Sequence, residues 1–326
     1  HAATMVVAGV YLVARLFPVY AISAPTGLEV VAYVGGFTSL FAAVIACTQF
    51  DIKRILAFST LSQIGYMMLA LGVSGYGGEE GLGFTASMFH LFTHAMFKAL
   101  LFLGAGAIIH AVHSNYMKDM GNLRKFLPIT HITFAIAVLA ISGIPPFAGF
   151  FSKDEILVAA FQHNKLLFFV EYAVAGITAF YMSRLYFSVF WGKKQEYHHA
   201  PKESPLTMTI PLMFLALASV TVGFIHFSKF VSSDMVPYES EFHWNIAIPS
   251  ILVALAGISL AAWMYMKETT IPDRLAKSLK GVYTATYNKF YIDEVYLFVT
   301  KKIIFNFISR PVAWFDRHIV DGTVNL

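Results

Sequence analysis

The sequence predicts an all-α fold: a polytopic membrane helix bundle with one broken helix, followed by a long amphipathic helix. Three observations predict it. Of the 326 residues, 57% are hydrophobic and only 13% are charged, against a usual charged share of roughly 25%. The apolar residues gather into runs of about 20, the length that crosses the hydrocarbon of a bilayer. The last 40 or so residues have a different composition, in which charged residues are mixed with aromatic and aliphatic ones. A soluble protein of this size could not cover its surface with so few charges.

About eight segments are apolar enough to span a membrane: 1–17, 29–50, 54–74, 84–113, 128–161, 164–191, 206–228 and 244–266. The fifth is too long for one straight span and contains Pro145 and Pro146. Prolines inside a helix remove backbone donors and break it. A broken helix is tolerated within a membrane where it lines a cavity, and its exposed ends form ion sites.

Residues 283–320 are too polar to span a membrane and too apolar for a solvated tail. This composition predicts a long amphipathic helix that lies along the membrane face, with a bend at Pro311.

Basic loops alternate with neutral or acidic ones through the apolar segments. The basic ones are 51–54, 118–125, 193–202 and 267–280, and the others are 75–81, the hinge near 163, and 229–243. The positive-inside rule places the basic loops and the amphipathic helix on the cytoplasmic side. Basic residues confined to loops indicate anionic lipid and not nucleic acid. A single cysteine, Cys47, excludes an internal disulfide and an all-cysteine metal site. Because the chain opens with His1 inside an apolar run, we expect an internal piece of a longer protein.

The stretch "HLFTHAMFKALLFL", residues 90–103, carries three ionisable groups in an otherwise apolar run. His90, His94 and Lys98 are spaced by four, so on a helix they climb one stripe in steps of ~6 Å. A lysine in mid-membrane costs roughly 2.5–3.5 kcal/mol on insertion scales and must face a polar interior. Desolvation penalises the charged form of such an amine, and histidine titrates near neutral pH. The pattern predicts a proton wire with water between the steps.

Other interpretations remain for the three ionisable groups of residues 90–98 and for the other charged residues within the apolar segments. Membrane histidines often serve only to hydrogen-bond and pack, and haem ligation is disfavoured because residues four apart on one helix cannot ligate opposite faces of one haem. Lys153, Asp154 and Glu155 follow the proline break directly, where they either form an ion site or cap a helix start at the surface. Glu171 and Arg184 lie within the sixth segment, where they either pair with neighbours or mark a polar axis, and we expect the structural role.

Several motifs resemble a known family. The stretches "HAATMVVAGVYLVAR", "DIKRILAFSTLSQIGYM", "HLFTHAMFKALLFL", "MGNLRK" and "GFFSKDEIL" are similar in order and content to the large antiporter-like subunit (subunit L) of respiratory complex I, the proton-translocating NADH–quinone oxidoreductase. The resemblance runs from residue 1 to about residue 190, and residues 283–326 resemble the start of that subunit's lateral helix. It implies four parts: the last helix of a first inverted repeat in 1–28, a second five-helix repeat in 29–192, two additional helices in 193–282 and the lateral helix in 283–326.

The resemblance implies roles for six residues. His90, His94 and Lys98 match the central proton-transfer residues of the family, Lys153 matches its lysine at the broken helix with Asp154 beside it, and His1 opens its "HAATMV" motif. Glu171 is not part of the pattern.

The function implied is proton translocation along a polar axis formed by His90, His94, Lys98 and Lys153. The translocation would be coupled to quinone reduction in a distant part of the complex. The chain itself would hold no cofactor and no redox centre; FMN, iron–sulfur clusters and quinone would belong to partner subunits. The implied partners are an antiporter-like neighbour, small membrane-arm subunits in contact with the lateral helix, and phospholipid, in a bacterial inner membrane. Two alternatives stay open: the large subunit of a multisubunit Na⁺/H⁺ antiporter, and a structural brace without a proton path.

Overall fold

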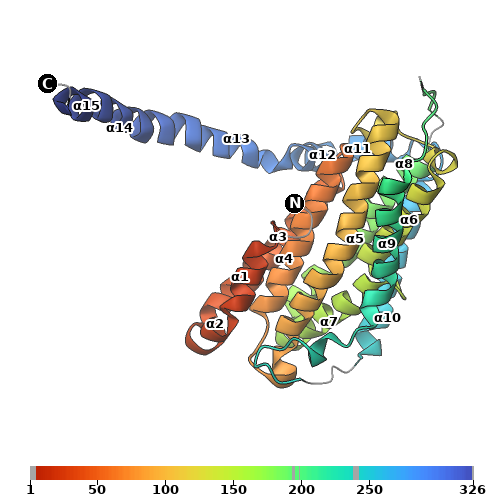
Figure 1. Cartoon of the computed structure of the whole chain (residues 1–326), viewed down its shortest axis with the longest axis horizontal. Helices are drawn as coiled ribbons and strands as arrows, with labels where there is room; N and C mark the ends of the chain where they lie inside the picture. The colour runs from red at the N-terminus through yellow and green to blue at the C-terminus, as the bar shows by residue number, and fades with distance from the viewer. Residues whose placement is uncertain (1–4, 193–194, 198, 238–241, 325–326) are drawn as a thin grey trace. The chain divides into compact units, whose positions relative to one another are not determined.

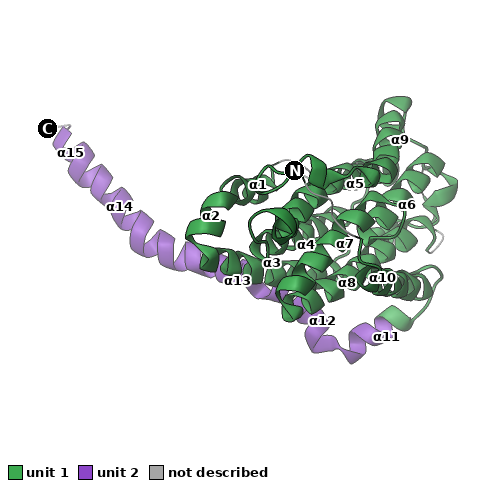
Figure 2. Cartoon of the chain, turned by 90° about the horizontal axis from the view of Figure 1, so that it is seen from below, with its two compact units in different colours: residues 1–272 green, residues 273–326 purple. Residues whose placement is uncertain are grey.

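The computed structural model describes residues 5–192, 195–197, 199–237 and 242–324. The described chain is helical, and its only β pairing is one isolated bridge between Asp51 and Tyr116. It divides into two compact units, residues 1–272 and residues 273–326 (Figure 2). The predicted all-α class is confirmed.

Unit 1 is a bundle of helices that run side by side (Figure 1). Six of its helices are long and apolar enough to cross a membrane: α3 (Pro25–Ala46), α4 (Ile52–Gly72), α5 (Leu82–Val112) with the 3₁₀ turn Gly78–Gly81 before it, α8 (Lys165–Phe190), α9 (Leu206–Thr221) continued by the 3₁₀ turn Val222–Phe224, and α10 (Trp244–Tyr265). Shorter helices complete the unit: α1 (Ala8–Arg15), α2 (Phe17–Ser23), α6 (Pro128–Ser142) and α7 (Ala148–His163).

Six spanning helices are fewer than the eight apolar segments expected. The segment 1–17 begins in residues outside the described part, and residues 8–23 form the two short helices α1 and α2. The segment 128–161 forms two half-length helices, α6 and α7. The predicted broken helix is therefore present, and its two halves together take the place of one span.

The break between α6 and α7 has a local cause. Gly143 ends α6 in the left-handed region, at φ 74°, where a residue without Cβ is favoured. The Pro145-Pro146 bond within the break is cis, and α7 begins directly afterwards. Gly149 then passes so close to α6 that a Cβ on it would lie 2.0 Å from the Ala140 carbonyl oxygen.

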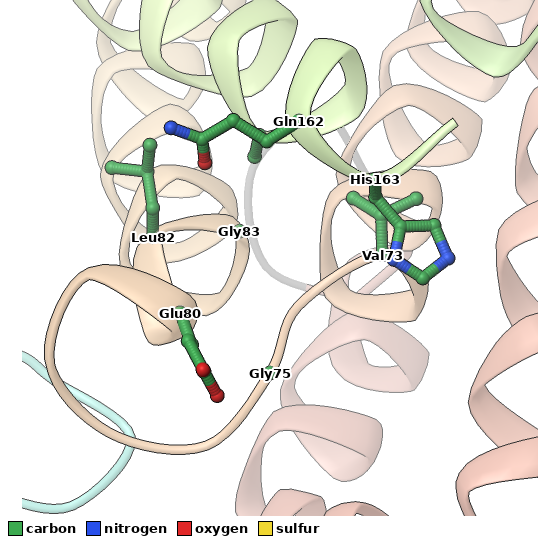
Figure 3. Close-up of a pocket in the computed structure, with 8 residues that line it drawn as sticks. Val73, Gly75, Glu80, Leu82, Gly83, Gln162 and His163 are labelled. Carbon is green, nitrogen blue, oxygen red and sulfur yellow. The ribbon is translucent and has the colours of Figure 1, made fainter. Parts of the chain in front are cut away.

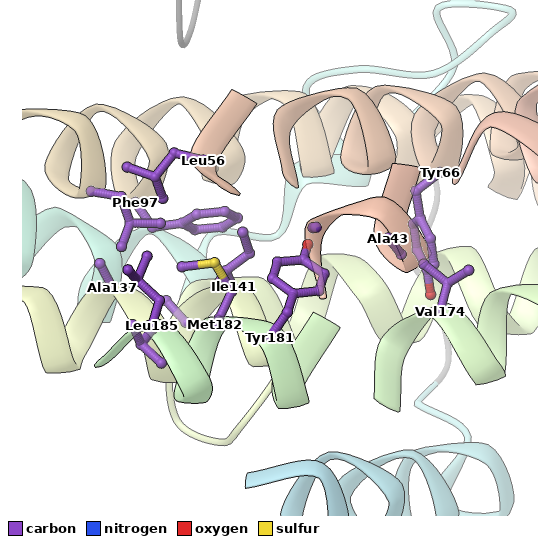
Figure 4. Packing of buried hydrophobic residues seen from close by; sticks show 14 of the residues in the cluster. Ala43, Leu56, Tyr66, Phe97, Ala137, Ile141, Val174, Tyr181, Met182 and Leu185 are labelled. Atoms are coloured by element: carbon purple, nitrogen blue, oxygen red, sulfur yellow. The ribbon is translucent and has the colours of Figure 1, made fainter. Parts of the chain in front are cut away.

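The core of unit 1 lies between α4, α5, α6, α7 and α8, and Figure 4 shows part of it, where Leu56, Phe97, Met182 and Leu185 pack together. Helices α3 and α4 approach closely, because a Cβ on Gly65 would lie 2.5 Å from the backbone nitrogen of Ser39. This contact brings polar side chains of both helices into the interior.

The loops gather at two ends of the bundle. At one end, the Ile52 amide donates to the Asn115 carbonyl at 3.0 Å, and the Tyr197 hydroxyl donates to the Gly121 carbonyl at 2.7 Å. These contacts join three of the basic loops. At the other end, the Gly77 amide donates to the Ser233 hydroxyl at 2.8 Å, which joins the acidic turn before α5 to the loop before α10. The alternation of loop charge along the chain therefore corresponds to two chemically different ends.

Unit 2 consists of helices joined by short turns (Figure 2). After α11 (Ile271–Ser278) and α12 (Lys280–Tyr287), the backbone turns at Lys289–Tyr291, where three consecutive residues have φ of 54°, 53° and 59°. Beyond this turn one long helix continues through 292–324, made of α13 (Ile292–Leu297), a π-helical stretch (Phe298–Ser309), α14 (Arg310–Phe315), a second π-helical stretch (Asp316–Val320) and α15 (Asp321–Val324). Ser309 and Arg310 keep right-handed helical dihedrals up to Pro311, so the left-handed turn lies earlier than the bend expected there.

Candidate functional site

The three ionisable residues of α5 all lie in the interior of unit 1. His90, His94 and Lys98 are each 0% exposed, and the two imidazole centroids are 6.0 Å apart. The spacing of four residues therefore produces the buried stripe that the sequence predicts. Lys98 does not face the surface of the bundle.

His90 is held by side chains from two other helices. Its Nδ1 lies 2.8 Å from the Ser152 hydroxyl of α7, and its Nε2 lies 3.0 Å from Oε1 of Gln63 on α4. The Ser152 hydroxyl also lies 2.9 Å from the Thr93 hydroxyl. Both ring nitrogens of His90 are thus engaged, and the imidazole connects α4 with α7.

His94 and Lys98 differ from His90 in their hydrogen bonding. Neither ring nitrogen of His94 nor the Nζ of Lys98 has a hydrogen-bond partner among the described residues. Buried polar atoms in proteins are paired with protein groups or with ordered water. We therefore expect internal water around these two side chains, about one and two helical turns beyond His90.

Lys153 lies in the interior just after the helix break. It is 3% exposed, and its Nζ donates a hydrogen bond of 2.6 Å to the Ile141 carbonyl oxygen in the last turn of α6. The carbonyls at a helix C-terminus lack intrahelical partners and carry partial negative charge. The ammonium also lies 5.7 Å from the ring centroid of Tyr66. Its buried position, six residues into α7, differs from that of a cap at an exposed helix start.

Asp154 follows Lys153 and is also 3% exposed. Its Oδ1 has no hydrogen-bond partner among the described residues. The adjacent carboxylate of Glu155 repels it electrostatically. Two carboxylates therefore follow the buried lysine in sequence on α7.

Two further charged residues, for which the sequence analysis expected a structural role, are also buried. Glu171 is 0% exposed and accepts a 2.6 Å hydrogen bond from the Ser39 hydroxyl of α3. Arg184 is 3% exposed, and its Nη1 donates to the Gln49 carbonyl at 2.8 Å. The sequence signal was available, because Glu171, Thr178, Tyr181 and Arg184 follow one another at spacings of seven and three, which place them on one face of α8.

His1, the sixth residue singled out from the sequence, lies outside the described residues. Within the part of the chain that the structure describes, no group of three or more His, Cys, Asp or Glu side chains is arranged to hold a metal ion.

A cavity of about 270 Å³ lies at the end of unit 1 opposite the basic loops (Figure 3). Its lining comes from the loop before α5 and the end of α7, and includes Glu80, Gln162 and His163. All three are exposed. The cavity therefore carries titratable groups at the surface end of the helix that holds Lys153.

These features define a class of protein, the multi-pass membrane proteins that carry amines and imidazoles inside a bundle with one broken helix. Residues 2–178 match the family described as NADH:quinone oxidoreductase/Mrp antiporter, TM. The chain belongs to this family, as the motif resemblance indicated.

Curated relatives include NAD(P)H-quinone oxidoreductase chain 5 of Picosynechococcus sp., which is 43% identical over 373 residues, with 100% of this chain and 54% of the relative covered. NADH-quinone oxidoreductase subunit L of Neisseria meningitidis is 40% identical over 378 residues, with 100% of this chain and 55% of the relative covered. The chain thus spans about half the length of these relatives. A solved structure of the Mrp complex from Dietzia sp. has a TM-score of 0.69 at 22% identity, covering 100% of this chain and 37% of that one. This last likeness shows the fold.

Proposed function

We propose that the chain is part of a proton-translocating membrane-arm subunit of NADH–quinone oxidoreductase. Protons move through the buried axis of His90, His94, Lys98 and Lys153, coupled to quinone reduction elsewhere in the complex. The observation that carries the proposal is the full burial of Lys98 in line with two imidazoles. A permanently charged amine at such a place is costly. An amine that exchanges a proton with its neighbours is not required to stay charged.

The imidazole of His90 is suited to pass a proton between helices. Ser152 and Gln63 contact its two nitrogens at 2.8 and 3.0 Å. An imidazole that receives a proton on one nitrogen can release the proton on the other. Repetition at His94, with water between the side chains, extends the route to Lys98.

Lys98 and Lys153 couple the protonation of one part of the axis to that of the next. An electrostatic interaction links their two amines, and charges interact strongly where water is scarce. Charging one amine favours discharge of the other. A change of charge introduced at one end of the axis therefore moves protons further along it.

The redox groups of the proposed complex belong to partner subunits. In this proposal FMN, iron–sulfur clusters and quinone are bound by those subunits, and the one cysteine of this chain is too few for the four thiolates of a cluster. The chain's partners are other membrane-arm subunits and phospholipid. The membrane is the bacterial inner membrane, with the basic loops and the C-terminal helix on the cytoplasmic side.

The parts of the chain are those that the motifs imply. Residues 1–28 hold the last helix of the first repeat, 29–192 the second five-helix repeat, 193–282 two additional transmembrane helices and 283–326 the start of the lateral helix. Asp154 and His1 also take part in proton transfer, as the motifs imply.

The test is the variant Lys98→Ala in the whole complex within sealed membrane vesicles. We expect the complex to assemble and its proton translocation to fall roughly tenfold or more, the scale at which a proton-transfer group matters. Wild-type translocation coupled to NADH oxidation would overturn the proposal. Double replacement of His94 and Lys98 by leucine separates it from a brace, which would lose assembly. Sodium-dependent exchange without NADH would instead indicate an antiporter.

A further inference from the structure

We propose that Glu171 is a further proton-carrying residue of this axis, which receives a proton from Lys153 and returns it. The inference deepens the proposed function and rests on it. It assigns chemistry to a carboxylate that the family motifs do not include, on a helix, α8, that carries none of the other proposed proton carriers.

The first observation is the burial of this carboxylate. Glu171 is 0% exposed, and its Oε1 accepts the Ser39 hydroxyl at 2.6 Å. Its other oxygen, Oε2, has no hydrogen-bond partner among the described residues. A buried carboxylate with one unsatisfied oxygen is costly unless a positive charge or a proton compensates it.

In this proposal the compensating charge is Lys153. The two groups influence each other electrostatically, and the amine itself donates a hydrogen bond to the neutral Ile141 carbonyl. A buried ammonium and a buried carboxylate offset the cost of each other's burial. The pair can also become neutral together, which removes both charges from the interior.

Tyr66 interacts with both groups. The Lys153 Nζ is 5.7 Å from its ring centroid, and Glu171 interacts with it electrostatically. Figure 4 shows its hydroxyl directed toward Val174, three residues after Glu171 on α8. This hydroxyl has no hydrogen-bond partner among the described residues. A phenol is both a donor and an acceptor, so it can take part in a short relay between the amine and the carboxylate.

The proton transfer balances without another reactant. In net terms an N–H bond of the Lys153 ammonium breaks and an O–H bond forms at Oε2 of Glu171. The Tyr66 hydroxyl, as the relay, gives one proton to the carboxylate and takes one from the ammonium. The products are a neutral amine and a neutral carboxylic acid, and the reverse step restores the two charges. The Ser39 hydroxyl stays bonded to Oε1 throughout, so the carboxyl group keeps its orientation.

The experiment compares Glu171→Gln with Glu171→Asp in the whole complex in sealed vesicles. Glutamine keeps the length of the side chain and an oxygen acceptor for Ser39, but it cannot accept the proton. We expect assembled Glu171→Gln complex to translocate roughly tenfold fewer protons per electron, and Glu171→Asp to recover part of the loss. Wild-type translocation in Glu171→Gln overturns the inference.

Two further measurements distinguish a failure of this inference from a failure of the proposed function. Lys98→Ala is measured in parallel: if it stops translocation while Glu171→Gln does not, this inference fails and the proposed function stands. If both variants translocate normally, both fail. Should Glu171→Gln not assemble, Glu171→Asp decides, because it keeps the charge but withdraws the carboxyl group by one methylene. A slowed translocation at normal assembly supports a carrier, and an unchanged rate overturns it.

Discussion

The amine of Lys153 donates a 2.6 Å hydrogen bond to the carbonyl oxygen of Ile141. The bond crosses the helix break, since Ile141 lies at the end of α6 and Lys153 in the second turn of α7. One side chain therefore has two tasks. It satisfies a helix C-terminus that the break leaves open, and it carries the charge that the proposed axis needs. Lys98 is equally buried but has no such bond.

This difference gives the first prediction. We expect Lys153→Met to lower both proton translocation and the thermal stability of the complex, because a hydrogen bond to a charged group contributes about 1.5–3 kcal/mol. Lys98→Met should lower translocation alone, since replacing a buried amine without a direct partner by an apolar chain of similar volume is neutral or stabilising. The measurements are the thermal midpoint of the purified complex and translocation in vesicles. Equal loss of stability in both variants would contradict the prediction.

The second prediction concerns the hydroxyl that orients His90. Ser152→Ala removes the 2.8 Å contact with Nδ1 and the 2.9 Å contact with Thr93. We expect translocation to slow while assembly is kept, because the imidazole loses a fixed partner on one nitrogen. The control is Thr221→Ala on α9. The hydroxyl of Thr221 donates a hydrogen bond to the Leu217 carbonyl of its own helix. A translocation rate equal in the two variants would show that Ser152 does not orient the ring for transfer.

Much of this site was predictable from the sequence, for physical reasons. The spacing of His90, His94 and Lys98 fixed one stripe because an α-helix has a constant rise and turn. The two prolines predicted the break because proline has no backbone donor. The carbonyl that Lys153 meets was not predictable, because that contact depends on how α7 folds back against α6.

Glu171 and Arg184 show where such reasoning stops. Each was expected to have a structural role, and each is buried beside a group from a distant part of the chain, Ser39 for Glu171 and Gln49 for Arg184. Hydropathy identifies a costly charge within a span but does not identify the partner, because partners come from tertiary packing. The left-handed turn at Lys289–Tyr291 likewise could not be predicted from the sequence, because it contains neither glycine nor proline.

The third prediction uses the close approach of α6 and α7. A Cβ at Gly149 would lie 2.0 Å from the Ala140 carbonyl oxygen, whereas a Cβ at Gly106 would meet nothing within 4 Å. We expect Gly149→Ala to displace α7, to lower stability by more than about 2 kcal/mol and to reduce assembled complex. Gly106→Ala should be neutral or slightly stabilising, because alanine favours helix by about 1 kcal/mol. The yield and thermal midpoint of the complex measure both, and an assembled, stable Gly149→Ala complex would contradict the packing described.

The fourth prediction concerns pH at the basic end, outside the spanning helices. The Tyr197 hydroxyl donates to the Gly121 carbonyl at 2.7 Å and accepts from the Gly121 amide at 3.0 Å. Partial burial raises the pKa of Tyr197 above its ordinary value, with the hydrogen bond from Gly121 acting in the opposite direction. The protonated phenol is therefore favoured in the folded state. Its contribution to stability is present below about pH 10 and is lost as pH rises through the raised pKa.

Tyr197→Phe removes this contribution, so we expect a loss of about 1 kcal/mol at neutral pH from the broken hydrogen bonds. The difference between wild type and variant should shrink as the pH rises above about 10. Thermal midpoints of the purified complex across this range measure it. Tyr116→Phe is the control, because Tyr116 lies in the same set of loops with 51% exposure. If the stability difference for Tyr197→Phe grew with pH, the hydroxyl would be favoured as a phenolate, and the contact with the Gly121 carbonyl would not be the one that stabilises the loop.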